Sequence, residues 1–336
     1  MLRPAECSYT PSRVRPRSAR ITRPKTSHRN SVRVLQRSPK GLSPLKRATL
    51  LEPSMKLLSS LLIAFATAIA VPHFLTAQES KPAAKPLRIL LITGGCCHDY
   101  EKQKDILKAG IEKRIHAVVD QVHTPDKSTK PPLAIFGNSD YAKGYDLVIH
   151  DECAASVSDE ATVQGVLHPH KSGIPGVNLH CAMHSYRIGS PGTPAQAGTP
   201  HAWWFEYLGL QSSSHGPQKP ISITHLDKNH PLSKGLPDWT TVNEELYNNI
   251  QVLDGATPLA RGKQIVQNKD GTEKEMDYVV AWTNLYQNKT RVFSTTIGHN
   301  NTTVEDDRYL DLVTRGVLWA TNNLQADGSP KAELKK

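Results

Sequence analysis

The chain has 336 residues, room for one large domain or two ordinary ones, and is 38% hydrophobic and 21% charged with 24 prolines. This composition excludes a collagen-like chain, a coiled coil and a polytopic membrane protein. Residues 1–54 hold 13 basic residues and two acidic ones, which gives them a net charge of +11. Because the whole chain has a net charge of +10, residues 55–336 carry a net charge of −1. No nucleic-acid partner is therefore expected for this nearly neutral part.

Two segments are predicted to precede the folded domain. Residues 1–54, rich in Arg, Pro and Ser, are expected to be a disordered basic extension, either from a misassigned start codon or as a nucleic-acid arm. Residues 55–77 have a short positive start, an apolar run at 57–71 and small residues near Ala77, which is typical of a secretory signal peptide too short to span a bilayer. We therefore expect a periplasmic or secreted protein with a linker at 78–86 and no stable membrane anchor.

The first half of the domain alternates between apolar strands and amphipathic helices. A continuous apolar run ending in a Gly-Gly pair is typical of a strand that is buried on both faces of a parallel sheet. Strands are expected at 87–93, 117–122, 146–150 and 173–180, helices at 100–115 and 158–168, and a loop at 125–141. This order predicts an α/β fold with a doubly wound, mostly parallel, flavodoxin-like sheet.

The second half is less regular. Its predicted elements are a loop at 189–200, a short aromatic helix at 202–208, strands at 220–226, 279–282 and 291–297, and a closing helix at 306–322. The domain is expected to span 87–324, followed by a polar tail at 325–336. The sequence contains no internal repeat.

Histidines mark the predicted carboxyl ends of the strands, where ligands of open α/β sheets bind. His98 follows the first strand, His180 ends the fourth and His299 follows the last, while His215 lies in the loop before Pro220. A lone histidine is usually structural, but three at equivalent positions predict one shared site, in which imidazole acts as an acid, a base or a ligand.

The turn after the fourth strand is where an α/β enzyme would place a nucleophile. Small residues two positions before and after favour His180 at this turn, which leaves Cys181 just inside the next helix as a buried, inert residue. The vicinal pair Cys96-Cys97 is not expected to form a disulfide with itself, because so short a ring resists disulfide geometry.

Further residues complete the candidate site. Glu245 is either part of a surface acidic pair or a carboxylate turned into the histidine cluster, as a general base or a metal ligand. His215, Tyr247 and either Trp203 or Trp204 are expected to contact the substrate, unless the tryptophans pack in the core.

A metal site is the alternative to acid/base chemistry without metal. His98, His180, His299 and Glu245 offer a mixed nitrogen and oxygen shell for Zn²⁺ or a similar divalent ion. None of these residues shares a helix turn or a tight hairpin with another, so only the fold can assemble them. The chain has no HExxH, P-loop, GxGxxG or CxxC motif.

Over about residues 87–324 the chain is similar to the ThuA-like (trehalose utilisation) family, relatives of the class I glutamine amidotransferases. The similarity lies in the order and spacing of short motifs rather than in any single one. They are Thr93-Gly94-Gly95 with His98, Gly176–His180, Trp203-Trp204-Phe205, His230-Pro231-Leu232 before Gly235-Leu236, Glu244–Tyr247, Val280–Thr283, Arg291-Val292-Phe293 with Gly298-His299, and Arg315–Ala320.

The resemblance implies the class I glutamine amidotransferase-like fold without amidotransferase chemistry, and a link to the metabolism of sugars and oxidised sugars. The sequence departs from the common pattern at Cys96-Cys97 and in the loop at 189–200.

Two functions are compatible with the sequence. The first is an exported enzyme, a hydrolase, lyase or isomerase, acting on a small trehalose-like or keto-sugar substrate. The second is a non-catalytic sugar-binding module on a degenerate enzyme fold. Several histidines beside a carboxylate favour the enzyme.

Overall fold

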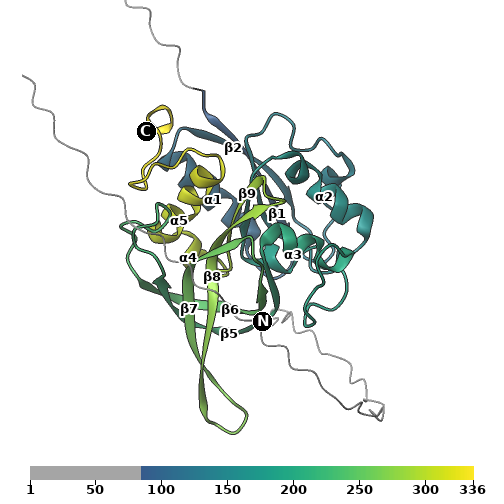
Figure 1. Ribbon diagram of the computed structural model, residues 1–336, viewed down its shortest axis with the longest axis vertical. Helices are drawn as coiled ribbons and strands as arrows, with labels where there is room; N and C mark the ends of the chain where they lie inside the picture. Colours follow the sequence, from purple (N-terminus) through teal and green to yellow (C-terminus); the bar gives the residue numbers. More distant parts are fainter. Residues whose placement is uncertain (1–84) are drawn as a thin grey trace, which may run out of the picture. The chain divides into compact units, whose positions relative to one another are not determined.

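The structure, a computed structural model, describes residues 85–336 (Figure 1). The predicted basic extension, the signal peptide and the linker up to residue 84 lie outside the described residues. None of the helices in residues 85–336 is both long and apolar enough to cross a lipid bilayer.

A nine-stranded mixed sheet forms the centre of the domain, with the strand order β2-β1-β3-β4-β9-β8-β7-β5-β6. The first five strands in this order are parallel and the others pair antiparallel. The strands are β1 (Leu87–Gly95), β2 (Ala117–Thr124), β3 (Leu147–Cys153), β4 (Gly176–Leu179), β5 (Leu210–His225), β6 (Trp239–Val252), β7 (Ala256–Gln267), β8 (Glu273–Tyr286) and β9 (Thr290–Thr295).

Helices cover both faces of the parallel half, so the predicted doubly wound α/β fold is confirmed (Figure 1). Helices α1 and α5 lie on one face, and α2 and α3 lie on the other. The helices are α1 (Tyr100–Arg114), α2 (Glu160–Ser172), α3 (Trp203–Leu208), α4 (Asn301–Val304) and α5 (Asp307–Ala320).

The continuous apolar run of β1 is explained by this double cover. Successive side chains of a strand point to opposite faces. Ile89 and Leu91 therefore pack with α1 and α5, whereas Leu90 and Ile92 pack in the cluster under α2 and α3. All four are 0–1% exposed, as a strand buried on both faces requires.

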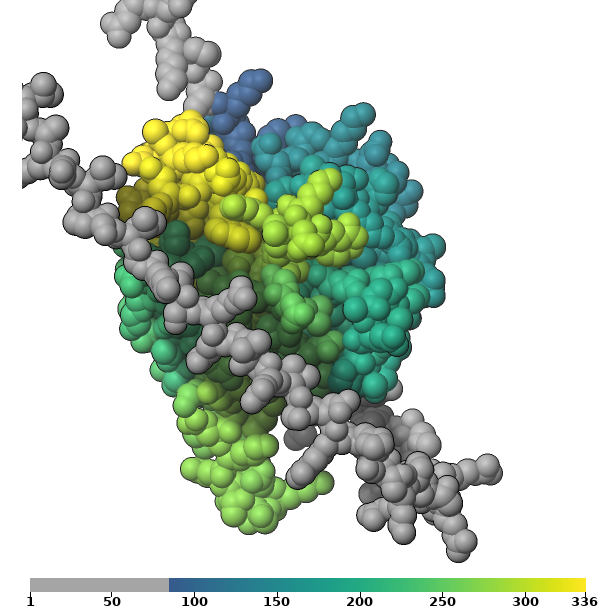
Figure 2. Space-filling model, in the orientation of Figure 1, coloured from purple at the N-terminus to yellow at the C-terminus, as the bar shows by residue number. Residues whose placement is uncertain are grey.

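The antiparallel half is larger than the sequence predicted. The expected strand at 220–226 begins at Leu210, the strand at 279–282 begins at Glu273, and β6 and β7 were not predicted at all. Polar residues and several register shifts in the β5–β6 pair interrupt the apolar alternation on which the prediction relied. The β7–β8 hairpin extends away from the rest of the domain (Figure 2).

Two helix and tail boundaries also differ. Helix α2, expected at 158–168, begins at Glu160 and ends at Ser172, and its N-cap is Asp159, whose carboxylate accepts the Thr162 amide at 2.9 Å. The segment predicted as a polar tail packs on the domain, since Leu334 is 3% exposed and its carbonyl accepts the His116 amide.

Helix α5 packs closely against β9 at Gly316. A Cβ at residue 316 would collide with the ring of Phe293, which is fully buried. We expect Gly316→Ala to lower the free energy of unfolding by about 1–3 kcal/mol through overpacking. Urea denaturation followed by circular dichroism measures the change. Gly192→Ala, in open space in the 189–200 loop, is the matched control, and equal midpoints for the two variants would contradict this packing.

Candidate functional site

The candidate site lies at the carboxyl ends of the parallel strands, where the sequence predicted it. His98 follows β1, His180 follows β4 and His299 follows β9. His180 has a left-handed backbone (φ 42°) and opens a short 3-10 helix at His180–His184, so the prediction that it occupies the tight turn is confirmed. Cys181 lies one residue into that helix.

Glu245 turns into the histidine cluster instead of lying on the surface. It is 7% exposed and lies within strand β6. Its carboxylate lies 3.5 Å from His180 Nε2, 3.4 Å from His299 Nδ1 and 3.7 Å from His215 Nε2. The rings of His180 and His299 have their centroids 4.5 and 4.7 Å from that of His98.

Three ring nitrogens of this cluster are buried without a hydrogen-bond partner among the described residues. They are His98 Nδ1, His180 Nε2 and His299 Nδ1. His180 Nδ1 lies 2.6 Å from the Thr296 carbonyl, which only accepts hydrogen bonds, so Nδ1 is the donor. A neutral His180 would then point a lone pair from Nε2 at the Glu245 carboxylate, an arrangement that a proton or a metal cation between them relieves.

The spacing of these atoms suits a metal ion. Ligands at 2.0–2.2 Å around a tetrahedral Zn²⁺ lie about 3.4 Å apart, longer than a good hydrogen bond. Glu245 Oε1 lies 3.4 Å from His299 Nδ1 and Glu245 Oε2 lies 3.5 Å from His180 Nε2, so each carboxylate oxygen is at about this distance from one imidazole. One ligand atom from each of His98, His180, His299 and Glu245 lies within 4.8 Å of the others.

The same contacts shift the ionisation of the cluster. Burial lowers the pKa of His180, but the neighbouring Glu245 carboxylate more than compensates and raises it to about 9. Burial raises the pKa of Glu245, but His180 and His299 outweigh that and hold it well below its usual range. Burial, and then the charges of His180 and His299, lower the pKa of His98 well below the ordinary histidine value.

Glu244, the neighbour of Glu245, fixes the loop that carries His299. Its fully buried carboxylate accepts the backbone amides of Gly298, His299 and Asn300 at 3.1, 2.9 and 2.9 Å. On the other side of the loop, Gln103 of α1 donates to the carbonyl of His299 at 3.1 Å. This loop is thus held from both sides, and the sequence alone did not indicate either anchor.

An aromatic and imidazole wall continues from the cluster. Tyr247 is buried, with its ring 5.0 Å from that of His180 and 5.7 Å from that of His215. His184, which the sequence analysis missed, stacks on Tyr247 at 4.1 Å and bonds Ser212 Oγ. Both predicted substrate contacts, His215 and Tyr247, are therefore brought to the site, and His215 is the most exposed of these side chains.

The tryptophans are not part of this wall. Trp204 is 1% exposed in the core under α2 and α3, where its Nε1 donates to the Ala182 carbonyl, so of the two alternatives this burial favours packing in the core over stacking on a sugar. Trp203 packs against the same core cluster, with Lys171 of α2 5.9 Å from its ring.

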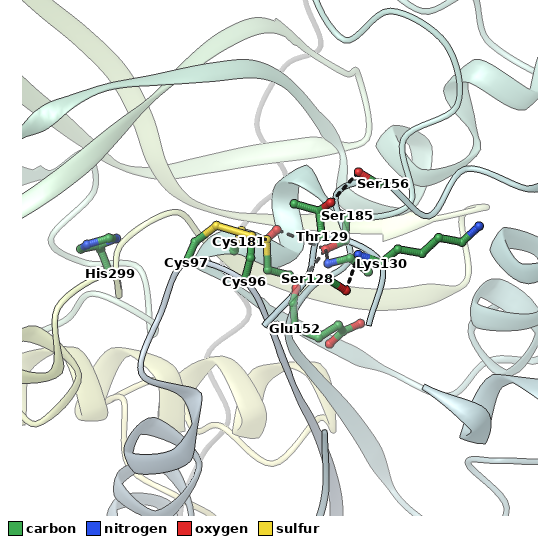
Figure 3. Close-up of a disulfide and its surroundings, with 12 residues drawn as sticks. Cys96, Cys97, Ser128, Thr129, Lys130, Glu152, Ser156, Cys181, Ser185 and His299 are labelled. Carbon is green, nitrogen blue, oxygen red and sulfur yellow. Dashed lines mark hydrogen bonds between the residues drawn. A yellow bond between two sulfur atoms is a disulfide. The ribbon is translucent and has the colours of Figure 1, made fainter. Parts of the chain in front are cut away.

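The cysteines differ from expectation. Cys96 and Cys97 form a disulfide with each other, so the prediction that they do not is wrong (Figure 3). Gly94, Gly95 and Cys97 all have positive φ, so the backbone turns after β1 and is no longer extended. In an extended backbone the side chains of Cys96 and Cys97 would point apart, whereas here they can reach each other. A hydrogen bond to Cys153 and burial raise the pKa of the Cys181 thiol.

A second buried polar network lies on the α2 side of the sheet. His150 bonds Glu152 at 2.8 Å and His170 at 3.0 Å, and Tyr186 donates to Glu152 at 2.6 Å. Burial, followed by the charge of His150, lowers the pKa of His170 to about 3. All four side chains are 0–1% exposed, which indicates a structural network rather than a ligand site.

Comparisons with known proteins agree with this architecture. A family model described as ThuA, trehalose utilisation, matches residues 88–320. A ThuA-like protein from Parabacteroides merdae is 20% identical with a TM-score of 0.51, covering 74% of this chain and 97% of that one. No curated protein gave a significant match.

Two solved structures are more distant. A GMP synthase protein from Thermoplasma acidophilum is 14% identical with a TM-score of 0.41, covering 70% of this chain and 94% of that one. The glutaminase domain of a Trypanosoma brucei CTPS is 11% identical with a TM-score of 0.37, covering 74% of this chain and all of that one.

The contact between His180 and Glu245 should set the pH at which the His180 imidazole loses its proton in chelator-treated protein. The His180 imidazole is expected to titrate near pH 9, against about 6.5 in the unfolded chain. Its stabilising contribution is complete below about pH 6.5 and is lost as the pH rises through 9. NMR titration of the imidazole nitrogens measures the midpoint.

In Glu245→Gln the carboxylate is gone and burial dominates, so the His180 midpoint should fall below about 6.5. Glu275→Gln, which removes an exposed carboxylate paired with Lys263, is the control and should leave the midpoint unchanged. A wild-type midpoint at or below the unfolded value would contradict the proposed coupling.

Proposed function

This chain belongs to the ThuA family, and we propose that it is an enzyme that converts a small carbohydrate at the cluster of His98, His180, His299 and Glu245. The observation that carries the proposal is the convergence of three buried, unpartnered ring nitrogens on one carboxylate. Because isolated polar atoms are costly to bury, such a set indicates that a cation or a substrate group completes it.

A divalent metal such as Zn²⁺ fits this set best. Three imidazoles and a carboxylate are its common ligands, and each Glu245 oxygen lies 3.4 or 3.5 Å from one imidazole nitrogen. When bound, such an ion would polarise an oxygen of the sugar or of a water molecule. The donation from His180 to the Thr296 carbonyl fixes the tautomer that leaves Nε2 free to bind it.

The surrounding residues supply the remaining parts of a mechanism. His215 lies beside Glu245 with a quarter of its side chain exposed, which suits an imidazole that exchanges protons with solvent. Glu244 holds the backbone of His299, and Tyr247 and His184 provide a rigid wall for a sugar ring. Hydrolysis, elimination and isomerisation all need this combination of a polarised oxygen and a movable proton.

The family description, trehalose utilisation, supports a trehalose-like disaccharide as the substrate, and its keto form is the second candidate. Amidotransferase chemistry is not proposed, because His180 occupies the turn where the nucleophile would stand and the adjacent Cys181 thiol is buried.

The metal prediction is tested on protein purified without chelators. We expect about one divalent ion per chain by elemental analysis, and a loss of metal affinity of at least about tenfold in His180→Ala and His299→Ala. The same variants should lose turnover of a panel of disaccharides and their 3-keto forms, and chelation should abolish wild-type turnover.

His168→Ala is the matched control, because His168 is an exposed histidine on α2, outside the site. It should retain both metal and turnover. Turnover that resists chelation would leave the imidazoles as metal-free acids and bases. Saturable binding of a sugar without any product would instead identify a sugar-binding module.

We also propose that the protein is exported, on the pattern of residues 55–77. The mature chain should then begin near Gln78 and be found outside the cytoplasm. N-terminal sequencing of protein from the native source measures this. A chain that begins at Met1, or that retains residues 57–71, would defeat the proposal.

A further inference from the structure

All four cysteines of residues 85–336 gather at the same edge of the sheet. Cys96 and Cys97 follow β1, Cys153 ends β3, and Cys181 follows β4. Cys153 Sγ lies 3.3 Å from Cys96 Sγ and 2.6 Å from Cys181 Sγ. Figure 3 shows the disulfide between Cys96 and Cys97 with Cys181 beside it. The sulfurs therefore form a row in the order Cys97, Cys96, Cys153, Cys181.

Neighbouring sulfurs of this row touch, which is the first requirement of thiol–disulfide exchange, and a small rotation of the Cys153 or Cys96 side chain would still be needed for an in-line attack. In exchange, one sulfur attacks a disulfide sulfur that it touches, and the other disulfide sulfur leaves. Cys153 touches Cys96, and its sulfur accepts the hydrogen of the Cys181 thiol. Cys153 is thus placed as the attacking sulfur, with Cys181 behind it.

Exposure differs sharply along the row. Cys153 is 0% exposed, and Cys96 and Cys181 are 7% exposed, whereas Cys97 is exposed. The buried end of the row is shielded from reagents in solution, so Cys97 is the member through which external thiols and disulfides have access.

We propose that the four cysteines form a thiol–disulfide exchange site in which one disulfide moves between the surface pair and the buried pair. Cys153 attacks Cys96, the Cys96–Cys97 bond breaks, and Cys97 leaves with the electron pair. Cys181 then attacks Cys153, the Cys96–Cys153 bond breaks, and Cys96 leaves. The protons of Cys153 and Cys181 pass to Cys97 and Cys96, so the isomerisation needs no external oxidant or reductant.

The site takes low-molecular-weight or protein thiols as its external partners, because the isomer with the buried disulfide presents Cys97 as a thiol at the surface. It also neighbours the histidine cluster along the chain. Cys97 directly precedes His98, and Cys181 directly follows His180. A transfer of the disulfide from Cys96–Cys97 to Cys153–Cys181 would therefore change the backbone next to the imidazoles of His98 and His180.

The test is trapping by N-ethylmaleimide in native full-length protein carrying Cys7→Ser, which removes the one cysteine outside the described residues. Acid quenching, peptic digestion and mass spectrometry then locate labels and disulfides. We expect labelling of Cys97 together with a Cys153–Cys181 disulfide, since alkylation traps the exposed thiol. In Cys153→Ser, labelling of Cys97 should slow by at least about tenfold and the Cys96–Cys97 disulfide should persist.

A second variant keeps the test decisive if Cys153→Ser does not fold. In Cys181→Ser the exchange should stop at the Cys96–Cys153 disulfide with Cys97 labelled. Retention of Cys96–Cys97 with labels only on Cys153 and Cys181, or no labelling at all, would overturn the proposal. So would four thiols without a disulfide that become reactive only after chelation, which would identify a thiolate metal site on the same sulfurs. None of these readouts depends on sugar turnover.

Discussion

The candidate chemistry of this protein depends on the parallel arrangement of five strands. Parallel strands present their carboxyl ends at one edge of the sheet, so residues that follow different strands meet there. His98, His180 and His299 come from β1, β4 and β9, and are separated by more than eighty residues in the chain. The cysteines after β1, β3 and β4 meet at the same edge for the same reason. A rearranged strand order would disperse both clusters.

The antiparallel half completes what the parallel half begins. Strand β6 lies at the far end of the strand order, yet it supplies two neighbouring carboxylates with different tasks. Both carboxylate oxygens of Glu244 accept hydrogen bonds from three backbone amides and so hold the loop that carries His299. Glu245 meets imidazoles and the amide of Gln218, and so keeps its charge available to the site. Structural and chemical functions are thus divided between adjacent residues.

Two histidine clusters in one domain illustrate how surroundings decide function. His150 and His170 bond each other and their neighbours, and burial keeps His170 neutral. In the site, by contrast, ring nitrogens of His98 and His299 remain without partners among the described residues. In the first network both imidazoles have hydrogen-bond partners inside the protein, although Glu152 Oε2 has none, whereas in the second network several ring nitrogens lack a partner among the described residues.

The sequence by itself determined the doubly wound core, because a strand buried on two faces and an amphipathic helix leave periodic apolar patterns in the chain. It also indicated His98, His180 and His299, since each lies within a few residues of the end of such a strand. Strands β6 and β7 left no such pattern, because polar residues and register shifts break the alternation. The direction of Glu245, the burial of Trp204 and the contacts of Cys153 were decided only by the tertiary structure. Each depends on contacts between residues far apart in the chain, which no local pattern records.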